Sequence, residues 1–129
     1  MTTVRDLVYR SLRVLGVNQS GENPSATEAQ DALEALNGML NSWYSLGIDL
    51  EFESFTDLSQ TVPYADDHMS AFAYNLAIEL APEYGVEVTG ALGARAATYF
   101  KMLQAQYVDP DILTIDPSLL YGPLYGRWL

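Results

Sequence analysis

Apolar residues recur at the three- and four-residue spacing of a helix face in four segments of this chain. The clearest segment runs from Ser25 to about Leu46. Ser25 and Glu28 can form a capping box at its start, and Gly47 stands where a C-terminal cap belongs. A helix of that length spans about 33 Å at roughly 1.5 Å per residue, which is enough to cross a small domain. The pattern predicts a long central helix with one apolar face, formed by Ala29, Ala32, Leu33, Leu36, Met39, Leu40 and Trp43.

Three further segments predict helices before and after the long one. The first helix starts after Thr2 or Thr3 and ends at Leu15, before Gly16. The fourth runs from Thr89 to about residue 106. The residues expected to face inward from the fourth helix are Leu92, Ala96, Tyr99, Phe100 and Leu103.

The third predicted helix has two apolar sides. It is capped by Asp66 and reaches about Tyr84, with Pro82 bending or ending its last turn. One side carries Met69, Phe72, Ala73, Leu76 and Leu80, and the other carries Ala71, Tyr74 and Ile78. A helix with two apolar sides is either central in a bundle or buried against another chain. We assign Ala71, Tyr74 and Ile78 to a contact between subunits.

Two segments have no helical period. Residues 48–62 read as an extended excursion, with a hairpin turn near residues 57–59, that serves either as a contact loop or as a simple link. Residues 107–129 contain Pro110, Pro117 and Pro123, so they cannot form one helix. This arm either folds back on its own body or reaches a partner with its apolar residues. Those expected to bind are Ile112, Leu113, Leu119, Leu120, Tyr121, Leu124, Tyr125, Trp128 and Leu129.

These segments predict an all-α fold, with a four-helix body over residues 1–106 and an extended arm over 107–129. A length of 129 residues fits one domain, and 49% hydrophobic residues are too many for general disorder. No apolar run approaches the roughly 18 residues of a membrane span, and we expect no membrane contact. Four helices and a proline-broken arm carry more apolar surface than we expect one protomer to bury.

The charge is strongly negative and unevenly distributed. The net charge is −11, and no Lys or Arg occurs between Val14 and Ala94. Tight binding to a phosphate backbone needs several cations on one surface. This composition therefore suits a channel through which DNA passes better than a DNA-binding surface. Arg5, Arg10 and Arg13 share one face of the first helix. That face is either solvated or a dock for the acidic surface of a neighbouring subunit.

The sequence offers little for catalysis. Cysteine is absent, and the one histidine, His68, stands beside two aspartates at a helix start, where we expect it on the surface. The carboxylate pairs Glu51/Glu53 and Asp109/Asp111 lack the context of a sugar cleft. Residues 109–111 also lack the glycine and glutamate of a calcium loop, and the side chains of a zinc site are missing. We expect no enzyme activity, no cofactor and no metal.

Several stretches together resemble the head-to-tail adaptor proteins of short-tailed bacteriophages, also called tail accessory or head-completion factors. These are Leu15-Gly16-Val17, a loop with Gly21, Glu22 and Pro24, then Glu28–Trp43, and finally Ala73–Gly85. The resemblance covers most of residues 3–106 and implies a virion protein of the head–tail junction, made in the host cytoplasm. It implies a dodecameric ring under the portal protein that seals the packaged DNA while DNA passes through without sequence-specific binding.

The resemblance also implies partners for two segments. The C-terminal arm would embrace the portal, and the loop between the second and third helices, with Phe52, Phe55 and Leu58, would meet the tail nozzle. That loop is shorter here than in many such proteins. Two alternatives stay open: a peptidoglycan hydrolase acting through one of the carboxylate pairs, and an acidic DNA mimic that binds a nucleic-acid enzyme.

Overall fold

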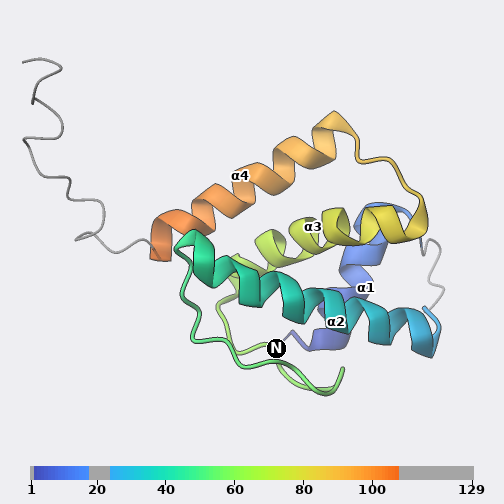
Figure 1. Cartoon of the computed structure of the whole chain (residues 1–129), viewed down its shortest axis with the longest axis horizontal. Helices are drawn as coiled ribbons and strands as arrows, with labels where there is room; N and C mark the ends of the chain where they lie inside the picture. The colour runs from blue at the N-terminus through green and yellow to red at the C-terminus, as the bar shows by residue number, and fades with distance from the viewer. Residues whose placement is uncertain (1, 18–23, 108–129) are drawn as a thin grey trace, which may run out of the picture.

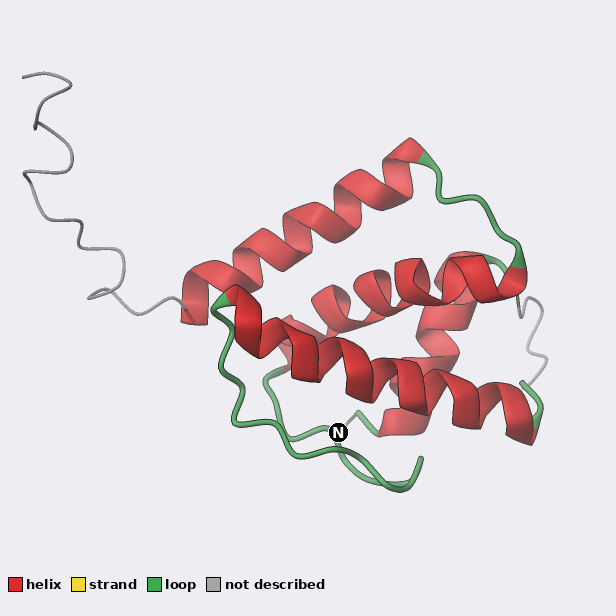
Figure 2. Cartoon of the chain, in the orientation of Figure 1, coloured by secondary structure: helices red, strands yellow, loops and turns green. Residues whose placement is uncertain are grey.

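Helix α3 lies at the centre of four α-helices in the computed structural model, which describes residues 2–17 and 24–107 (Figure 1). The helices are α1 (Val4–Leu15), α2 (Ala26–Trp43), α3 (Met69–Leu80) and α4 (Gly90–Tyr107). Helix α3 packs against each of the other three. The described residues form no β-strand (Figure 2), which confirms the all-α prediction.

The predicted caps form at the ends of α1 and α2. The Thr3 hydroxyl accepts from the Asp6 N–H, and the Ser25 hydroxyl accepts from the Glu28 N–H, each as half of a capping box. Gly16 and Gly47 adopt the left-handed conformation at φ 86° and 89°, which ends each segment. The last turn of the long segment, Tyr44–Leu46, tightens to a 3₁₀ helix.

The boundaries of α3 and α4 differ slightly from the predictions. Asp66 does not cap α3, because residues Asp66–His68 form a 3₁₀ turn preceded by Ala65. A second 3₁₀ turn, Ala81–Tyr84, contains Pro82 and follows α3. Helix α4 extends one residue further than expected, to Tyr107, and the Thr89 hydroxyl accepts from the Leu92 N–H at its start.

One apolar side of α3 is buried within the chain, and the other is buried only in part. Phe72 and Leu76 are fully buried, and Ala71 is only 2% exposed. The prediction that Ala71 takes part in a contact between subunits is therefore wrong, because the same protomer already covers it. Tyr74 and Ile78 are half-buried. Helix α3 is therefore central in the bundle, and the assignment of Tyr74 and Ile78 to a contact between subunits stays a prediction.

Aromatic rings join α2, α3 and α4 at one end of the molecule. The Trp43 ring lies 5.7 Å from the Phe72 ring and 5.1 Å from the Phe100 ring, the latter edge-on. Nearby, the Gln104 side chain donates to the Leu46 carbonyl at 2.9 Å. The Asn75 amide donates to the Ala71 and Ala96 carbonyls and so ties α3 to α4. In the described part of the chain, only Tyr44, Leu46 and Met102 remain as exposed large apolar residues, so the body hides more of its apolar surface than we expected.

The excursion between α2 and α3 packs on the body instead of forming a hairpin. Its chain turns at residues 57–60, where the hairpin turn was expected. The segment after the turn then pairs with the N-terminus: the Val4 N–H donates to Gln60, the Arg5 N–H to Leu58 and the Val62 N–H to Thr2, each at 2.9 Å. The Gln60 and Leu58 carbonyls satisfy two N–H groups that the first turn of α1 leaves without helical partners. The hairpin prediction is wrong because the N-terminal segment is the better partner.

Candidate partner-binding surfaces

The predicted portal-binding arm lies outside the described residues, but the residue at its root does not. Tyr107 ends α4, and its hydroxyl oxygen lies 2.7 Å from Nε2 of His68. Nδ1 of His68 lies 2.8 Å from the Asp67 carboxylate. Burial, with a smaller contribution from the charge of Asp67, raises the pKa of Tyr107, so its hydroxyl stays protonated and can donate to Nε2.

The prediction of an exposed His68 is wrong, because only 5% of this residue is exposed. One ring nitrogen forms a hydrogen bond with Asp67, and the other forms one with Tyr107. The imidazole also packs edge-on against the Phe72 and Tyr107 rings. The sequence shows the polar neighbours of His68, but Tyr107 lies 39 positions away. His68 therefore anchors the end of α4, where the arm begins.

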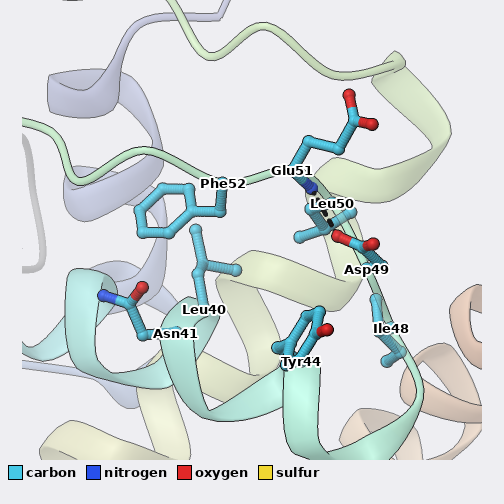
Figure 3. A pocket seen from close by; sticks show the side chains of 8 residues that line it. All are labelled: Leu40, Asn41, Tyr44, Ile48, Asp49, Leu50, Glu51 and Phe52. Carbon is cyan, nitrogen blue, oxygen red and sulfur yellow. Dashed lines mark hydrogen bonds between the residues drawn. The ribbon is translucent and has the colours of Figure 1, made fainter.

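The excursion forms one wall of an open groove of about 370 Å³ along the C-terminal half of α2 (Figure 3). Leu40, Asn41 and Tyr44 line it from α2, and residues 48–52 line it from the excursion. The Glu51 carboxylate points away from these α2 side chains (Figure 3). Glu51 has φ 52°, an uncommon conformation for a non-glycine residue, and its N–H donates to the Asp49 carboxylate at 3.0 Å.

The residues predicted to face the tail are less exposed than expected. Phe55 is 6% exposed and belongs to the core, while Phe52 and Leu58 are half-buried against it. The Asn37 side chain holds the segment in place: its amide donates to the Phe55 carbonyl at 2.9 Å, and its oxygen accepts from the Phe55 N–H at 2.8 Å. The expectation that Phe55 is available to a tail protein is wrong for this conformation. Asn37, a polar residue beside the apolar face of α2, was the signal for this contact in the sequence.

Arginines from two helices contact one tyrosine of α3. The guanidinium carbon of Arg10 lies 5.9 Å from the centre of the Tyr74 ring, and that of Arg95 lies 5.8 Å from it. Arg10 also donates to the Ser70 hydroxyl at 3.1 Å, and Arg95 donates to the Tyr74 hydroxyl at 3.4 Å. An open pocket of about 470 Å³ adjoins these residues, lined by Val14, Tyr74, Ala91, Leu92 and Arg95. We call Arg10 together with these lining residues the basic cleft.

The arginines of α1 have two different environments. Arg5 and Arg13 are exposed, as a solvated or docking face requires, whereas Arg10 is half-buried against α3. In the described part of the chain, no arginine forms an ion pair with a carboxylate. Arg95 was not expected in this group, because it lies 85 positions after Arg10 and only the packing of α1 and α4 on α3 brings the two together.

The described carboxylates do not form an evident catalytic or metal site. Glu51 and Glu53 both border a second groove of about 230 Å³, but both are exposed. A general acid in glycoside hydrolysis needs a carboxyl group shielded from water, which neither provides. Among residues 2–17 and 24–107, no group of three or more potential ligand side chains could hold a metal ion. Asp109 and Asp111 lie outside the described residues.

The fold and its surfaces define a small all-α protein whose notable features are surfaces suited to contact. In the described part, none of the helices has the length and apolar character required to span a bilayer. A family model described as P22 tail accessory factor matches residues 1–112. The chain therefore belongs to the P22 tail accessory factor family, a structural family of phage tail proteins. This membership confirms the resemblance to the tail accessory factors of short-tailed phages.

Proposed function

We propose that this protein is a non-enzymatic head-to-tail adaptor that forms a dodecameric ring under the portal, seals the packaged DNA and connects to the tail nozzle. The match of residues 1–112 to the tail accessory factor family carries this proposal. The net charge of −11 supports it, because a negative lining lets DNA slide without binding. The protein acts in the virion, at the head–tail junction.

The C-terminal arm is the proposed portal contact. Its residues Tyr121, Leu124, Tyr125 and Trp128 supply the aromatic and aliphatic anchors that dominate many protein interfaces. The described body has few exposed large apolar residues of its own, which leaves the arm as the richest source of such anchors. The root of the arm is fixed by the contact of Tyr107 with His68.

Deletion of residues 108–129 tests the portal contact. Because Tyr107 is kept, α4 retains its contact with His68, and circular dichroism should show an intact helical body. Binding to the purified portal of the same phage should be lost, as should the ring on the portal in electron micrographs. A second variant replaces Tyr121, Leu124, Tyr125 and Trp128 by alanine and should also lose binding.

A matched control in the same arm is Asp109→Asn/Asp111→Asn, which changes polar residues and leaves the anchors intact. This variant should bind the portal like the natural chain. Unchanged portal binding by the deletion variant would defeat the arm assignment. A full-length chain that forms no complex with the portal would defeat the adaptor proposal itself.

A further inference from the structure

We propose that the basic cleft binds an acidic segment of a second copy of this chain, formed by Asp49, Glu51 and Glu53, which we call the acidic row. This contact would repeat from one subunit to the next around the ring. The inference rests on the proposed ring and deepens it, because it names the two surfaces that meet. It also adds Arg95 to the residues first expected at the subunit contact.

The cleft has the chemistry of a carboxylate site. A guanidinium has five N–H donors in a rigid fork that matches a carboxylate. Arg10 donates one hydrogen bond to Ser70, and Arg95 donates one to Tyr74. Most N–H donors of both guanidinium groups therefore remain available to a partner. In the described part of the chain, no carboxylate pairs with either arginine. Both guanidinium carbons lie within 5.9 Å of the centre of the Tyr74 ring, and this cation–π contact helps to fix their positions.

The surroundings of the cleft favour a protein partner over a phosphate backbone. Val14, Ala91 and Leu92 give the pocket apolar walls, which can receive the stems of glutamate side chains or apolar neighbours. The cations near the cleft are few, while residues 24–89 contain many carboxylates and no Lys or Arg. Such a surface repels long polyanions but attracts a short acidic segment.

The acidic row has the complementary properties. Asp49, Glu51 and Glu53 are exposed, and no lysine or arginine of the described residues forms an ion pair with them. The intervening Leu50 is buried and Phe52 is half-buried, so the backbone of the row is held against the body. The hydrogen bond from the Glu51 N–H to Asp49 stabilises the unusual turn that directs Glu51 outward (Figure 3). The carboxylates therefore project from a fixed support.

The two surfaces belong to different parts of one protomer. The row lies beside the C-terminal half of α2, whereas the cleft lies between α1, α3 and the first turns of α4. Helices α1 and α4 carry all the described arginines and lysines, and the only acid in these two helices is Asp6. A contact between unlike surfaces of identical chains is heterologous, and it generates a closed ring when the rotation per subunit divides a full turn.

Cysteine crosslinking tests the contact directly, because the natural chain has no cysteine. The variant Ala91→Cys/Glu53→Cys places one thiol at the cleft and one at the row, both at exposed positions. Treated with a short bismaleimide crosslinker, the full chain should give a ladder of covalent dimers, trimers and larger species. The experiment is run on the chain alone and on the chain with purified portal, and a ladder in either preparation supports the contact.

The matched control is Ala91→Cys/Glu34→Cys, which moves the second thiol to an exposed acid of α2 outside the row. It should remain largely monomeric. No ladder from the Glu53 pair in either preparation would overturn the proposal, as would an equal ladder from the Glu34 pair. Double-stranded DNA could also bind the chain and block crosslinking of the Ala91→Cys/Glu53→Cys variant. That result would overturn the proposal, since the cleft would then be a phosphate site.

Charge exchange provides a second test that does not depend on a crosslinker. The variant Arg10→Glu/Arg95→Glu makes the cleft acidic, and Glu51→Arg/Glu53→Arg makes the row basic. Each alone should weaken subunit association by about tenfold or more, because like charges then meet. An equimolar mixture of the two should associate normally, since every contact in an alternating ring again joins opposite charges. Continued weak association of the mixture would reject the pairing.

Arg10 is half-buried within the protomer, so its replacement can affect folding as well as association. The single variant Arg95→Glu therefore leaves Arg10 unchanged. This variant should also weaken subunit association, but less than the double variant does. Mixing it with Glu51→Arg/Glu53→Arg should again restore association. The outcomes are separable from those of the portal test. A crosslinked ladder from a chain that fails to bind portal would support the subunit contact and reject the adaptor role. Portal binding without a ladder would support the adaptor role and reject this subunit contact.

Discussion

A buried histidine fixes the point at which the arm leaves the body. His68 has hydrogen-bond partners at both ring nitrogens, which is the condition under which a polar ring can be buried at low cost. One partner, Tyr107, is the last residue of α4. The pair therefore couples the start of α3 to the end of α4. This contact between two side chains therefore holds the last residue of α4 in place.

Replacing Tyr107 by phenylalanine tests that role. The change removes the hydroxyl that satisfies Nε2 of His68 and leaves the ring in place, so the free energy of unfolding should fall by about 1–2 kcal/mol, the usual cost of an unpaired buried polar group. Urea denaturation followed by tryptophan fluorescence measures it. Tyr44→Phe is the control, because Tyr44 is 69% exposed, and it should change stability by less than about 0.5 kcal/mol. Equal effects of the two changes would contradict the anchoring role.

At the scale of the elements, α2 shows how one residue type has opposite effects at two positions. Gly38 lies inside the helix on its exposed side, and Gly47 ends the helical segment with φ 89°. A Cβ atom added at either position would meet no other atom within 4 Å. Both sites therefore have room for an alanine side chain, and the two glycines differ in their backbone conformation.

We expect the same substitution to change stability in opposite directions at these glycines. Gly38→Ala should stabilise the protein by about 0.5–1 kcal/mol, because alanine loses less backbone entropy in a helix. Gly47→Ala should destabilise it by about 1 kcal/mol or more, because a side chain is strained at positive φ. Thermal and urea unfolding measure both. A shift of the same sign in the two variants would show that the helix ends differently in solution.

The excursion shows why elements without a period are hard to place from sequence. Its apolar residues predicted contact with something, and the sequence alone allowed a tail protein as well as the body. The Asn37 amide and the N-terminal segment bind its backbone groups, and both partners are distant in the chain. Phe55 is therefore a core residue, and the acids on either side of Phe52 are the exposed part of the excursion.

At the scale of the whole molecule, charge is segregated between two groups of elements. Helices α1 and α4 carry the described cations and meet on α3, while α2, the excursion and α3 contribute carboxylates and no Lys or Arg. A protomer with one basic and one acidic surface is complementary to a copy of itself. The arm is different in kind, since its expected anchors are apolar and aromatic.

This difference predicts opposite responses to salt. Raising ionic strength from about 0.1 M to about 1 M shortens the Debye length from roughly 10 Å to roughly 3 Å, so exposed charge pairs weaken. Association between subunits should therefore fall severalfold in analytical ultracentrifugation. Binding of the arm to portal, measured with a peptide of residues 108–129, should be unchanged or slightly stronger. Subunit association that resists salt would contradict a contact made by the basic cleft.

The sequence by itself determined the four helices and the caps of the first two, because those depend on contacts within a few residues; at α3 the expected cap, Asp66, lies in a 3₁₀ turn instead. The capping box at Ser25 and the glycines at positions 16 and 47 formed as predicted, and of the two expected caps of the first helix it is Thr3 that caps it. The sequence also indicated the family, since its motifs are read directly from the residues. It left the position of α3 undecided between the bundle core and another chain, because a period of apolar residues does not say what covers them.

Only the tertiary structure decided which distant residues meet. It buried His68 against Tyr107, covered Ala71 within the protomer, and brought Arg10 and Arg95 to the same ring, that of Tyr74. Each of these contacts joins positions that no helical repeat relates, so no local pattern could predict them. The physical reason is that side-chain burial and pairing depend on how helices cross, whereas helix formation depends on the backbone hydrogen bonds of neighbouring residues.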